Sequence, residues 1–250
     1  MQVSPRHPDI ETLILGAAET GKTIDLAGNR YRSDVDDSAI PPKNRFLAGL
    51  VRELHASRIL EVGTFHGGAI MAMTHGLLPS ITQPEILTID VESHNEEGFA
   101  NYPQINRVIR DSLSPLTIDD VRQTFSDHID LLFIDSGHDY RQAFENIAVY
   151  GNLLKPRIIV LDDIALNRSM SRMWERVKYL APGAVEDISA IAGRTNVGFG
   201  LIGPQYPFEW PEMGAARRAA WRGYWAAGRA IVPRLPTSSA QRVRQLLRGQ

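Results

Sequence analysis

Four short apolar runs and one weaker run, separated by helix-like segments, constrain most strongly how this 250-residue chain can fold. They are RILEVG (58–63), EILTID (85–90), DLLFID (130–135), RIIVLDD (157–163) and the weaker INRVIRD (105–111). Strands that alternate with helices are typical of a parallel sheet with helices on both faces. From the amphipathic segment NRFLAGLVRELHA (44–56) onward, the sequence therefore predicts an α/β fold with a doubly wound, mostly parallel sheet.

Aspartates end three of the four stronger runs, at Asp90, Asp135 and Asp163. In an open α/β sheet, ligands bind in the crevice at the carboxyl ends of the strands. An aspartate at such an end therefore indicates a polar binding site. The alternative is that each aspartate caps the helix or turn that follows it. Three such residues together favour the binding site.

The glycine-rich turn EVGTFHGG (61–68) indicates the kind of ligand. Its glycines are Gly63, Gly67 and Gly68, so it lacks the second glycine of G-x-G-x-x-G, which makes room for a pyrophosphate. A cofactor without phosphates fits this turn better, which disfavours an NAD-dependent oxidoreductase. Asp90 ends the second run, where a carboxylate can accept hydrogen bonds from both hydroxyls of a ribose. The pattern therefore favours a nucleoside-like ligand.

Five motifs, taken in order, resemble those of the class I S-adenosylmethionine-dependent methyltransferases. They are EVGTFHGG, LTID, RDSL, DLLFIDSGHDY and LLKPRIIVLDD. More narrowly, residues 40–205 are similar to metal-dependent O-methyltransferases that act on sugar hydroxyls in macrolide and mycobacterial methylmannose polysaccharide pathways. The resemblance implies a Rossmann-like, seven-stranded sheet and S-adenosylmethionine as the cofactor. It also implies methyl transfer to a hydroxyl of a small molecule, with a carbohydrate as the favoured acceptor.

The resemblance further implies which residues bind the cofactor. They are Glu61, Gly63, Thr64, Gly67, Asp90, Asp111, Ser112 and Asp135. In the family, the acid and the glycines of the first motif line the methionine part, and the acid that ends the second strand holds the ribose. The Asp-Ser pair after the third strand lies by the adenine.

Asp135, Asp162 and Asp163 follow two strands that would be neighbours in such a sheet. Converging carboxylates raise one another's pKa, and a divalent cation removes that repulsion. Oxygen ligands suit Mg²⁺ or Mn²⁺, so we expect these three residues to bind one of them. The alternative is that Asp162 or Asp163 caps the next helix. Catechol-type relatives carry an asparagine near the third ligand, which makes Asn167 a rival.

His138 lies three residues after Asp135, in a turn before a predicted helix that starts near Tyr140. Histidine can act as a general base near neutral pH, so we expect His138 to take the proton of the acceptor hydroxyl. A structural role is the alternative, and it is the one expected for His66, His75, His94 and His128. Catechol-type relatives place a lysine just after the first metal aspartate. Its replacement here by Gly-His favours an aliphatic, carbohydrate hydroxyl over a phenol.

Gly16–Thr23 fits G-x-x-x-x-G-K-[ST], the pattern of a phosphate-binding loop. Such a loop needs a strand before it and a helix that starts at its Lys-Ser/Thr pair. The preceding residues instead have a helical period, Gly21 resembles a helix stop, and no helical pattern follows Lys22. A P-loop nucleotide hydrolase is therefore a lesser alternative. A second alternative is a non-catalytic methyltransferase-like module for binding or dimerisation.

Composition excludes some classes of protein and leaves the two ends open. The chain has no cysteine, a net charge of −2 and no long apolar run, so we expect a cytoplasmic protein without nucleic-acid or membrane partners. Residues 1–43 are expected to form an N-terminal helix and, over residues 24–43, either a segment that closes over the site or an ordinary surface loop. Residues 44–205 are expected to form the cofactor-binding domain, and 206–250 a basic extension with Trp221 and Trp225. That extension could contact nucleic acid, a membrane, the acceptor or a second subunit.

We favour packing of these tryptophans on the core or on a second subunit. The expected partners are therefore a small-molecule or oligosaccharide acceptor and a second copy of the chain in a homodimer.

Overall fold

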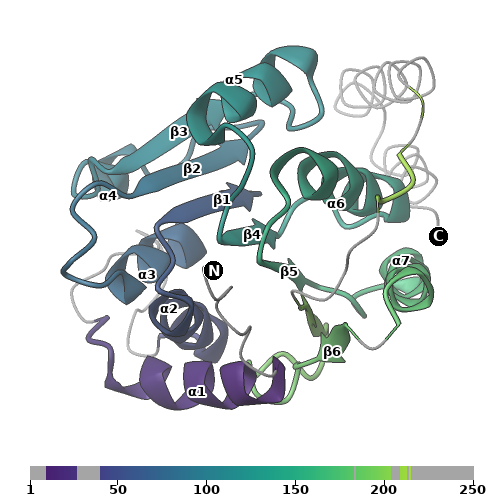
Figure 1. The fold of residues 1–250 in the computed structure, drawn as a ribbon, viewed down its shortest axis with the longest axis horizontal. Helices are drawn as coiled ribbons and strands as arrows, with labels where there is room; N and C mark the ends of the chain where they lie inside the picture. The colour runs from purple at the N-terminus through teal and green to yellow at the C-terminus, as the bar shows by residue number, and fades with distance from the viewer. Residues whose placement is uncertain (1–9, 27–39, 183, 204–208, 213, 215–250) are drawn as a thin grey trace, which may run out of the picture.

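The computed structural model describes residues 10–26, 40–182, 184–203, 209–212 and 214. Within these residues, seven strands form one sheet in the order β3-β2-β1-β4-β5-β7-β6 (Figure 1). The first five strands in this order are parallel to one another, and β7 runs antiparallel to both β5 and β6. The predicted Rossmann-like, doubly wound and mostly parallel sheet is confirmed.

All five apolar runs form strands. These are β1 (Arg58–Val62), β2 (Glu85–Asp90), β3 (Ile105–Ile109), β4 (Leu131–Ile134) and β5 (Ile158–Asp162). A later strand, β7 (Phe199–Ile202), pairs with β5. The short β6 (Val185–Asp187) has no apolar run, because all three of its residues are partly or fully exposed at the sheet edge.

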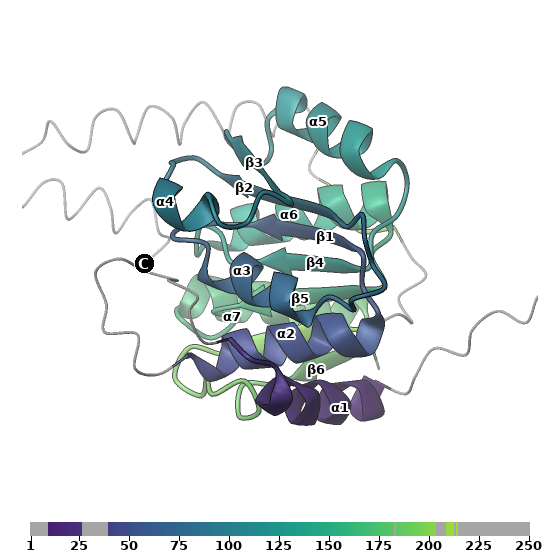
Figure 2. The same cartoon turned by 90° about the vertical axis from the view of Figure 1, so that its left-hand side faces the viewer.

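Helices cover both faces of the sheet (Figures 1 and 2). On one face they are α1 (Ile10–Thr23), α2 (Pro42–Leu54), α3 (Gly68–Gly76) and the short α4 (Glu96–Phe99). On the other face they are α5 (Pro115–Phe125), α6 (Tyr140–Leu154) and α7 (Arg168–Leu180). Consecutive residues of one strand therefore enter different cores: Ile59 packs in the cluster with Leu47, and Leu60 in the cluster with Ile147. Burial on both faces explains why the strands read as continuous apolar runs.

The expected helix stop at Gly21 is wrong, because α1 continues to Thr23. A Cβ at Gly21 would lie 2.2 Å from the carbonyl oxygen of Arg45 in α2. The glycine therefore allows the two helices to pack closely. The apparent phosphate-loop motif lies inside α1, and Lys22 pairs with Glu19 on its exposed surface at 2.5 Å. The nucleotide-hydrolase alternative lacks the strand and the loop that it requires.

Several predicted segments lie outside the described residues. They are most of the segment that could close over the site, including Tyr31, and the extension with Trp221 and Trp225. The expectations for these segments, and the predicted domain boundaries, stay predictions. Among the helices that are described, none combines the length and the apolar character needed to cross a membrane.

Candidate active site

A cavity of about 970 Å³ opens at the carboxyl ends of the central strands. Most of the predicted site residues line it. They are Glu61, Gly63, Thr64, Asp90, Asp111, Ser112, Asp135 and His138. Gly67, Asp162 and Asp163 are not among the described residues that line this cavity. The site therefore forms where the strand pattern predicted it, although not every predicted residue faces the same space.

Two glycines shape the turn between β1 and α3. Gly63 has φ 101°, and a Cβ there would lie 1.9 Å from the carbonyl oxygen of Asp135. Gly67 has φ 83°, and a Cβ there would lie 2.4 Å from the ring of Phe99. Both positions combine a left-handed backbone with close contact, which only glycine tolerates without strain. Gly67 thus shapes the turn, and Gly63 brings the end of β1 against the end of β4.

Asp90 fastens this turn to the end of β2. Its Oδ2 accepts a hydrogen bond from Phe65 N at 2.7 Å, and its Oδ1 accepts one from Val91 N at 2.6 Å. Glu92 N also donates to Oδ1, at 3.3 Å, so the lone pair that remains for another donor is on Oδ2. Asp90 can therefore hold the turn and still accept a hydrogen bond from a ligand in the cavity.

Glu61 begins a buried chain of hydrogen bonds. Thr88 Oγ1 donates to Glu61 Oε2 at 2.5 Å, and Thr64 Oγ1 lies 2.5 Å from Thr88 Oγ1. Burial raises the pKa of Glu61 well above its ordinary value, although the Thr88 hydrogen bond opposes this shift. The Thr64 hydroxyl is thus paired with Thr88, and toward a ligand it could act only as a hydrogen-bond acceptor.

Asp111 and Ser112 follow β3, and hydrogen bonds hold them to the next residues of the loop and to α6. Asp111 Oδ1 accepts from Leu113 N at 2.9 Å, and Ser112 Oγ donates to Asn146 Oδ1 of α6 at 2.8 Å. The hydroxyl of Tyr150 donates to the carbonyl oxygen of Ser112. These contacts fix the loop that borders the cavity opposite the acidic residues.

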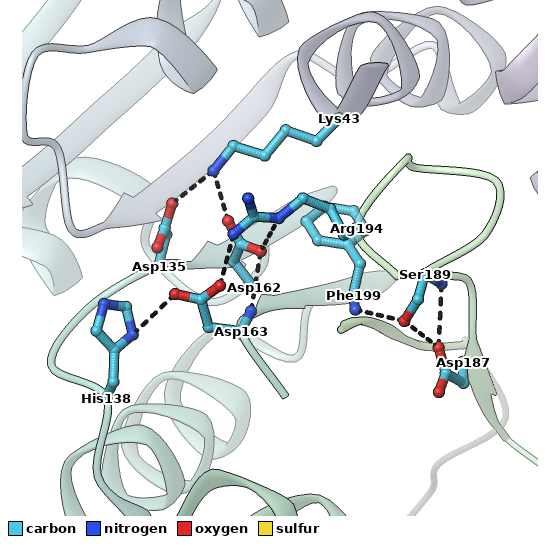
Figure 3. Close-up of polar contacts among 9 residues, drawn as sticks. All are labelled: Lys43, Asp135, His138, Asp162, Asp163, Asp187, Ser189, Arg194 and Phe199. Carbon is cyan, nitrogen blue, oxygen red and sulfur yellow. Dashed lines mark hydrogen bonds and ion pairs between the residues drawn. The ribbon is translucent and has the colours of Figure 1, made fainter. Parts of the chain in front are cut away.

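The carboxylates of Asp135, Asp162 and Asp163 converge, as the sequence predicted (Figure 3). Asp135 follows β4 and Asp162 ends β5. Consecutive side chains of a strand point to opposite faces. Asp163, however, has φ 60° and leaves the strand, so both Asp162 and Asp163 contact the same guanidinium.

Two cations that the sequence did not reveal neutralise this cluster. Lys43 Nζ lies 3.0 Å from Asp135 Oδ2 and 2.5 Å from Asp162 Oδ2. Arg194 Nε donates to Asp162 Oδ1 at 3.0 Å, and its Nη2 donates to Asp163 Oδ1 at 2.5 Å. The Asp162 side chain has no exposed surface and both of its oxygens are engaged. Asp162 is therefore bound by the protein's own cations.

A signal for Lys43 was present in the sequence. Lys43 lies in the first turn of α2, where the helix dipole disfavours a positive charge and no acidic residue occurs. A lysine in that place indicates an anionic partner elsewhere in the fold. Arg194 lies in the loop between β6 and β7, where no periodic pattern relates it to the strand ends.

The charges of the cluster shift one another's pKa values. Burial raises the pKa of Asp135 to about 6, while Lys43 lowers it and Asp162 raises it. Burial, followed by Asp162, also raises the pKa of Asp163. For Lys43, burial lowers the pKa, but Asp135 and Asp162 outweigh it and the net shift is upward. The ammonium therefore stays charged at neutral pH.

His138 lies at the edge of the cluster. Its Nδ1 is 3.3 Å from Asp163 Oδ2, and 41% of its side chain is exposed. Asn167 Nδ2 donates to the carbonyl oxygen of His138 at 3.0 Å, and Asn167 Oδ1 caps α7 by accepting from Met170 N. The neighbouring Asp139 caps α6. Asn167, the rival third ligand, therefore positions the histidine loop and does not join the acidic cluster.

The residues that converge include a set able to hold a metal ion, but it differs from the predicted one. Asp135, His138 and Asp163 each offer a ligand atom within 4.8 Å of the others. Asp162 is not in this set. Mg²⁺ favours octahedral oxygen ligation, whereas this set includes a nitrogen and has the Lys43 ammonium bound to one of its carboxylates. The residues present are therefore a poor fit to Mg²⁺.

The sequence and the fold were compared with known proteins. Residues 60–164 match the family model of a methyltransferase domain. This methyltransferase-domain match extends from β1 through β5 and includes Asp90, Asp135 and His138. Among curated proteins, no match was found.

Two solved structures are similar to the chain in fold. One is the O-methyltransferase TomG from Streptomyces achromogenes, involved in tomaymycin synthesis and solved in complex with SAM. It has 20% identity and a TM-score of 0.50, with 80% of this chain and 92% of TomG covered. The other is cofactor-bound Rv0187 from MTB, with 18% identity and a TM-score of 0.50, where 81% of this chain and 99% of that chain are covered. At these identities the likeness establishes a shared fold.

Proposed function

We propose that this protein is an S-adenosylmethionine-dependent O-methyltransferase that acts on a hydroxyl of a small molecule. The observation that carries the proposal is the composition of one cavity. It is bordered by Asp90 and Ser112, which suit a nucleoside, and by Asp135 and His138, which suit proton transfer. The methyltransferase-domain match over residues 60–164 supports the same activity.

The proposed cofactor position follows the strand ends. Asp90 accepts a hydrogen bond from the ribose through the remaining lone pair of Oδ2, and the Asp111-Ser112 loop borders the adenine. Gly63 and Glu61 border the methionine part. Held in this way, S-adenosylmethionine supplies an electrophilic methyl group on a sulfonium ion. The rigid strand ends contribute to the rate by fixing the methyl group near the acceptor.

His138 is the proposed general base. With Nδ1 facing Asp163, the free lone pair is on Nε2, which takes the hydroxyl proton of the acceptor. The acceptor oxygen forms a bond to the methyl carbon as the carbon–sulfur bond breaks, and sulfur keeps that electron pair. Asp163 stabilises the imidazolium that results, as a carboxylate does beside a catalytic histidine.

A carbohydrate is the proposed class of acceptor. The cavity has charged groups beside apolar ones, since Phe65 and Leu166 line it and are 54% and 41% exposed. A sugar presents hydroxyls at its rim and apolar C–H groups on its faces. The exposed ring of Phe65 suits such a face, and the carboxylates suit the hydroxyls.

A divalent cation is the second candidate for the group that polarises the acceptor. Mg²⁺ or Mn²⁺ would use Asp135, Asp163 and His138, whose ligand atoms lie close together. His138 would then be a ligand and could not also be the base. The homodimer, the absence of nucleic-acid and membrane partners, and the cytoplasmic location remain proposals from the sequence.

Ligand-dependent thermal unfolding tests the proposed function. The protein should be heated with S-adenosylmethionine, S-adenosylhomocysteine, NAD or ATP, each with and without Mg²⁺. A ligand that binds only the folded state raises the melting temperature. Of these ligands, we expect only S-adenosylmethionine and S-adenosylhomocysteine to raise the melting temperature. The rise should be smaller in Asp90→Ala and equal to that of the wild type in the exposed control Asp127→Ala. Transfer of a labelled methyl group to a panel of sugars then identifies the acceptor. Stabilisation by ATP or NAD alone would contradict the proposal.

A further inference from the structure

The Lys43 ammonium occupies a bridging position between two strand ends. It contacts Asp135 after β4 and Asp162 at the end of β5, and both carboxylates offer their Oδ2 to it (Figure 3). A cation that joins carboxylates from neighbouring strands would be bound in this way. Here the cation is covalently part of the chain and belongs to the first turn of α2.

The charges in the cluster are already nearly balanced. Three carboxylates face two permanent cations, since Arg194 contacts Asp162 and Asp163 and Lys43 contacts Asp135 and Asp162. A divalent ion at the remaining ligand atoms would bind Asp135, whose other oxygen holds the ammonium at 3.0 Å. Like charges at such short range repel strongly where burial reduces screening.

We propose that Lys43, supported by Arg194, takes the place of a divalent cation in this protein and polarises the acceptor hydroxyl. The first part, exclusion of a metal by Lys43, stands on the geometry of the cluster. The second part rests on the proposed function.

Lys43 is positioned for that second role. Its side chain is 18% exposed and lines the same cavity as His138. An ammonium has three N–H donors, of which two go to Asp135 and Asp162. The third can donate to the acceptor oxygen. Donation lowers the pKa of the hydroxyl, its proton passes to His138, and the oxygen forms the new bond to the methyl carbon.

Binding of Mn²⁺ in the absence of any other ligand tests the first part. Electron paramagnetic resonance should count the bound Mn²⁺ for the wild type, Lys43→Met and the control Lys22→Met, whose lysine lies on the exposed surface of α1. We expect no stoichiometric site in the wild type or in Lys22→Met. We expect one site in Lys43→Met, with an affinity at least about tenfold higher, and its loss in Lys43→Met/Asp135→Asn.

The wild type decides the question even if Lys43→Met does not fold. One tightly bound Mn²⁺ per wild-type chain would overturn the proposal, as would activity that chelation abolishes and Mg²⁺ restores. Absence of Mn²⁺ binding in a folded Lys43→Met would also overturn it, because Lys43 would then not be what excludes the ion.

Methyl transfer tests the second part. We expect Lys43→Met to lower kcat with little change in the affinity for S-adenosylmethionine, and we expect Mn²⁺ to restore part of kcat in this variant alone. Unchanged kcat would overturn the polarising role. Failure of the proposed function is recognised separately, because S-adenosylmethionine would then not bind the wild type, while the Mn²⁺ result would be unaffected.

Discussion

Lys43 Nζ lies 2.5 Å from Asp162 Oδ2, which joins the start of α2 to the end of β5 across 119 positions of sequence. The contact connects a helix on one face of the sheet to the carboxyl ends of the strands, where the cavity opens. Because Asp162 is fully buried and also bound by Arg194, its carboxylate is a central element of the cluster.

Replacement of Asp162 by asparagine should destabilise the fold. Asp162→Asn removes the carboxylate that both cations contact and leaves Lys43 with Asp135 alone and Arg194 with Asp163 alone. Loss of one partner of a buried ion pair costs about 3 to 5 kcal/mol, and the remaining carboxylates should keep the loss below that range. Urea denaturation of the wild type and the variant measures the change. The control Asp127→Asn is on the surface and should leave the free energy of unfolding nearly unchanged. An equally stable Asp162→Asn would show that the pair is not required for stability.

Replacement of Gly63 by alanine should affect both stability and cofactor binding. A Cβ in Gly63→Ala meets the Asp135 carbonyl oxygen and takes a left-handed φ, so we expect a loss of at least about 2 kcal/mol. The shift of the turn should also weaken S-adenosylmethionine binding. Calorimetric titration and thermal unfolding measure the two effects. Gly214→Ala is the matched control, since a Cβ there has nothing within 4 Å, and equal behaviour of the two variants would be inconsistent with this explanation.

Replacement of His138 by alanine should separate chemistry from cofactor binding. If His138 is the general base, kcat of His138→Ala should fall by about 10²-fold to 10⁴-fold. The dissociation constant of S-adenosylmethionine should change little, because the proposed role of His138 is toward the acceptor and not toward the cofactor. Initial rates and equilibrium titration measure the two quantities. The control His128→Ala removes an exposed histidine, and retention of wild-type kcat by His138→Ala would remove the base from the mechanism.

The buried Glu61 should make stability depend on pH. Its pKa is raised in the folded protein, mainly by burial, from an ordinary value of 4.5. Above that value the unfolded chain releases the proton while the folded chain retains it, so stability falls as pH rises toward the folded pKa. We expect Glu61→Gln to reduce this decline in urea titrations between about pH 5 and pH 9. The exposed control Glu97→Gln should keep the wild-type slope, and an unchanged slope in Glu61→Gln would contradict the assignment.

The sheet could be predicted from the sequence because each inner strand is buried on both faces. Ile59 and Leu60 pack in different cores, so both consecutive residues must be apolar and the strand appears in the sequence as an uninterrupted apolar run. The acids at the strand ends could be predicted for the same reason, since Asp135 and Asp162 continue two such runs. β6 could not be predicted in this way, because its exposed residues at the sheet edge do not have to be apolar.

The cations of the site were harder to predict because their positions depend on tertiary packing. Lys43 reaches the cluster because α2 begins beside the carboxyl ends of β4 and β5. Arg194 reaches it from an irregular loop. The predicted helix stop at Gly21 is wrong for a related reason. Its small size serves the contact of α1 with α2, and a local pattern cannot distinguish that use from a helix end.

The hydrogen bond from Phe65 N to Asp90 Oδ2 holds the glycine-rich turn between β1 and α3 against the end of β2. A ligand that donates a hydrogen to the remaining lone pair of Asp90 Oδ2 would leave these contacts intact. A ribose with a phosphate on its 2′-oxygen would bring negative charge against the carboxylate and compete with the backbone donor. If Asp90 binds the ribose as proposed, this end of the sheet should favour unphosphorylated nucleosides, and the residue that binds the ribose would also maintain the shape of the cavity.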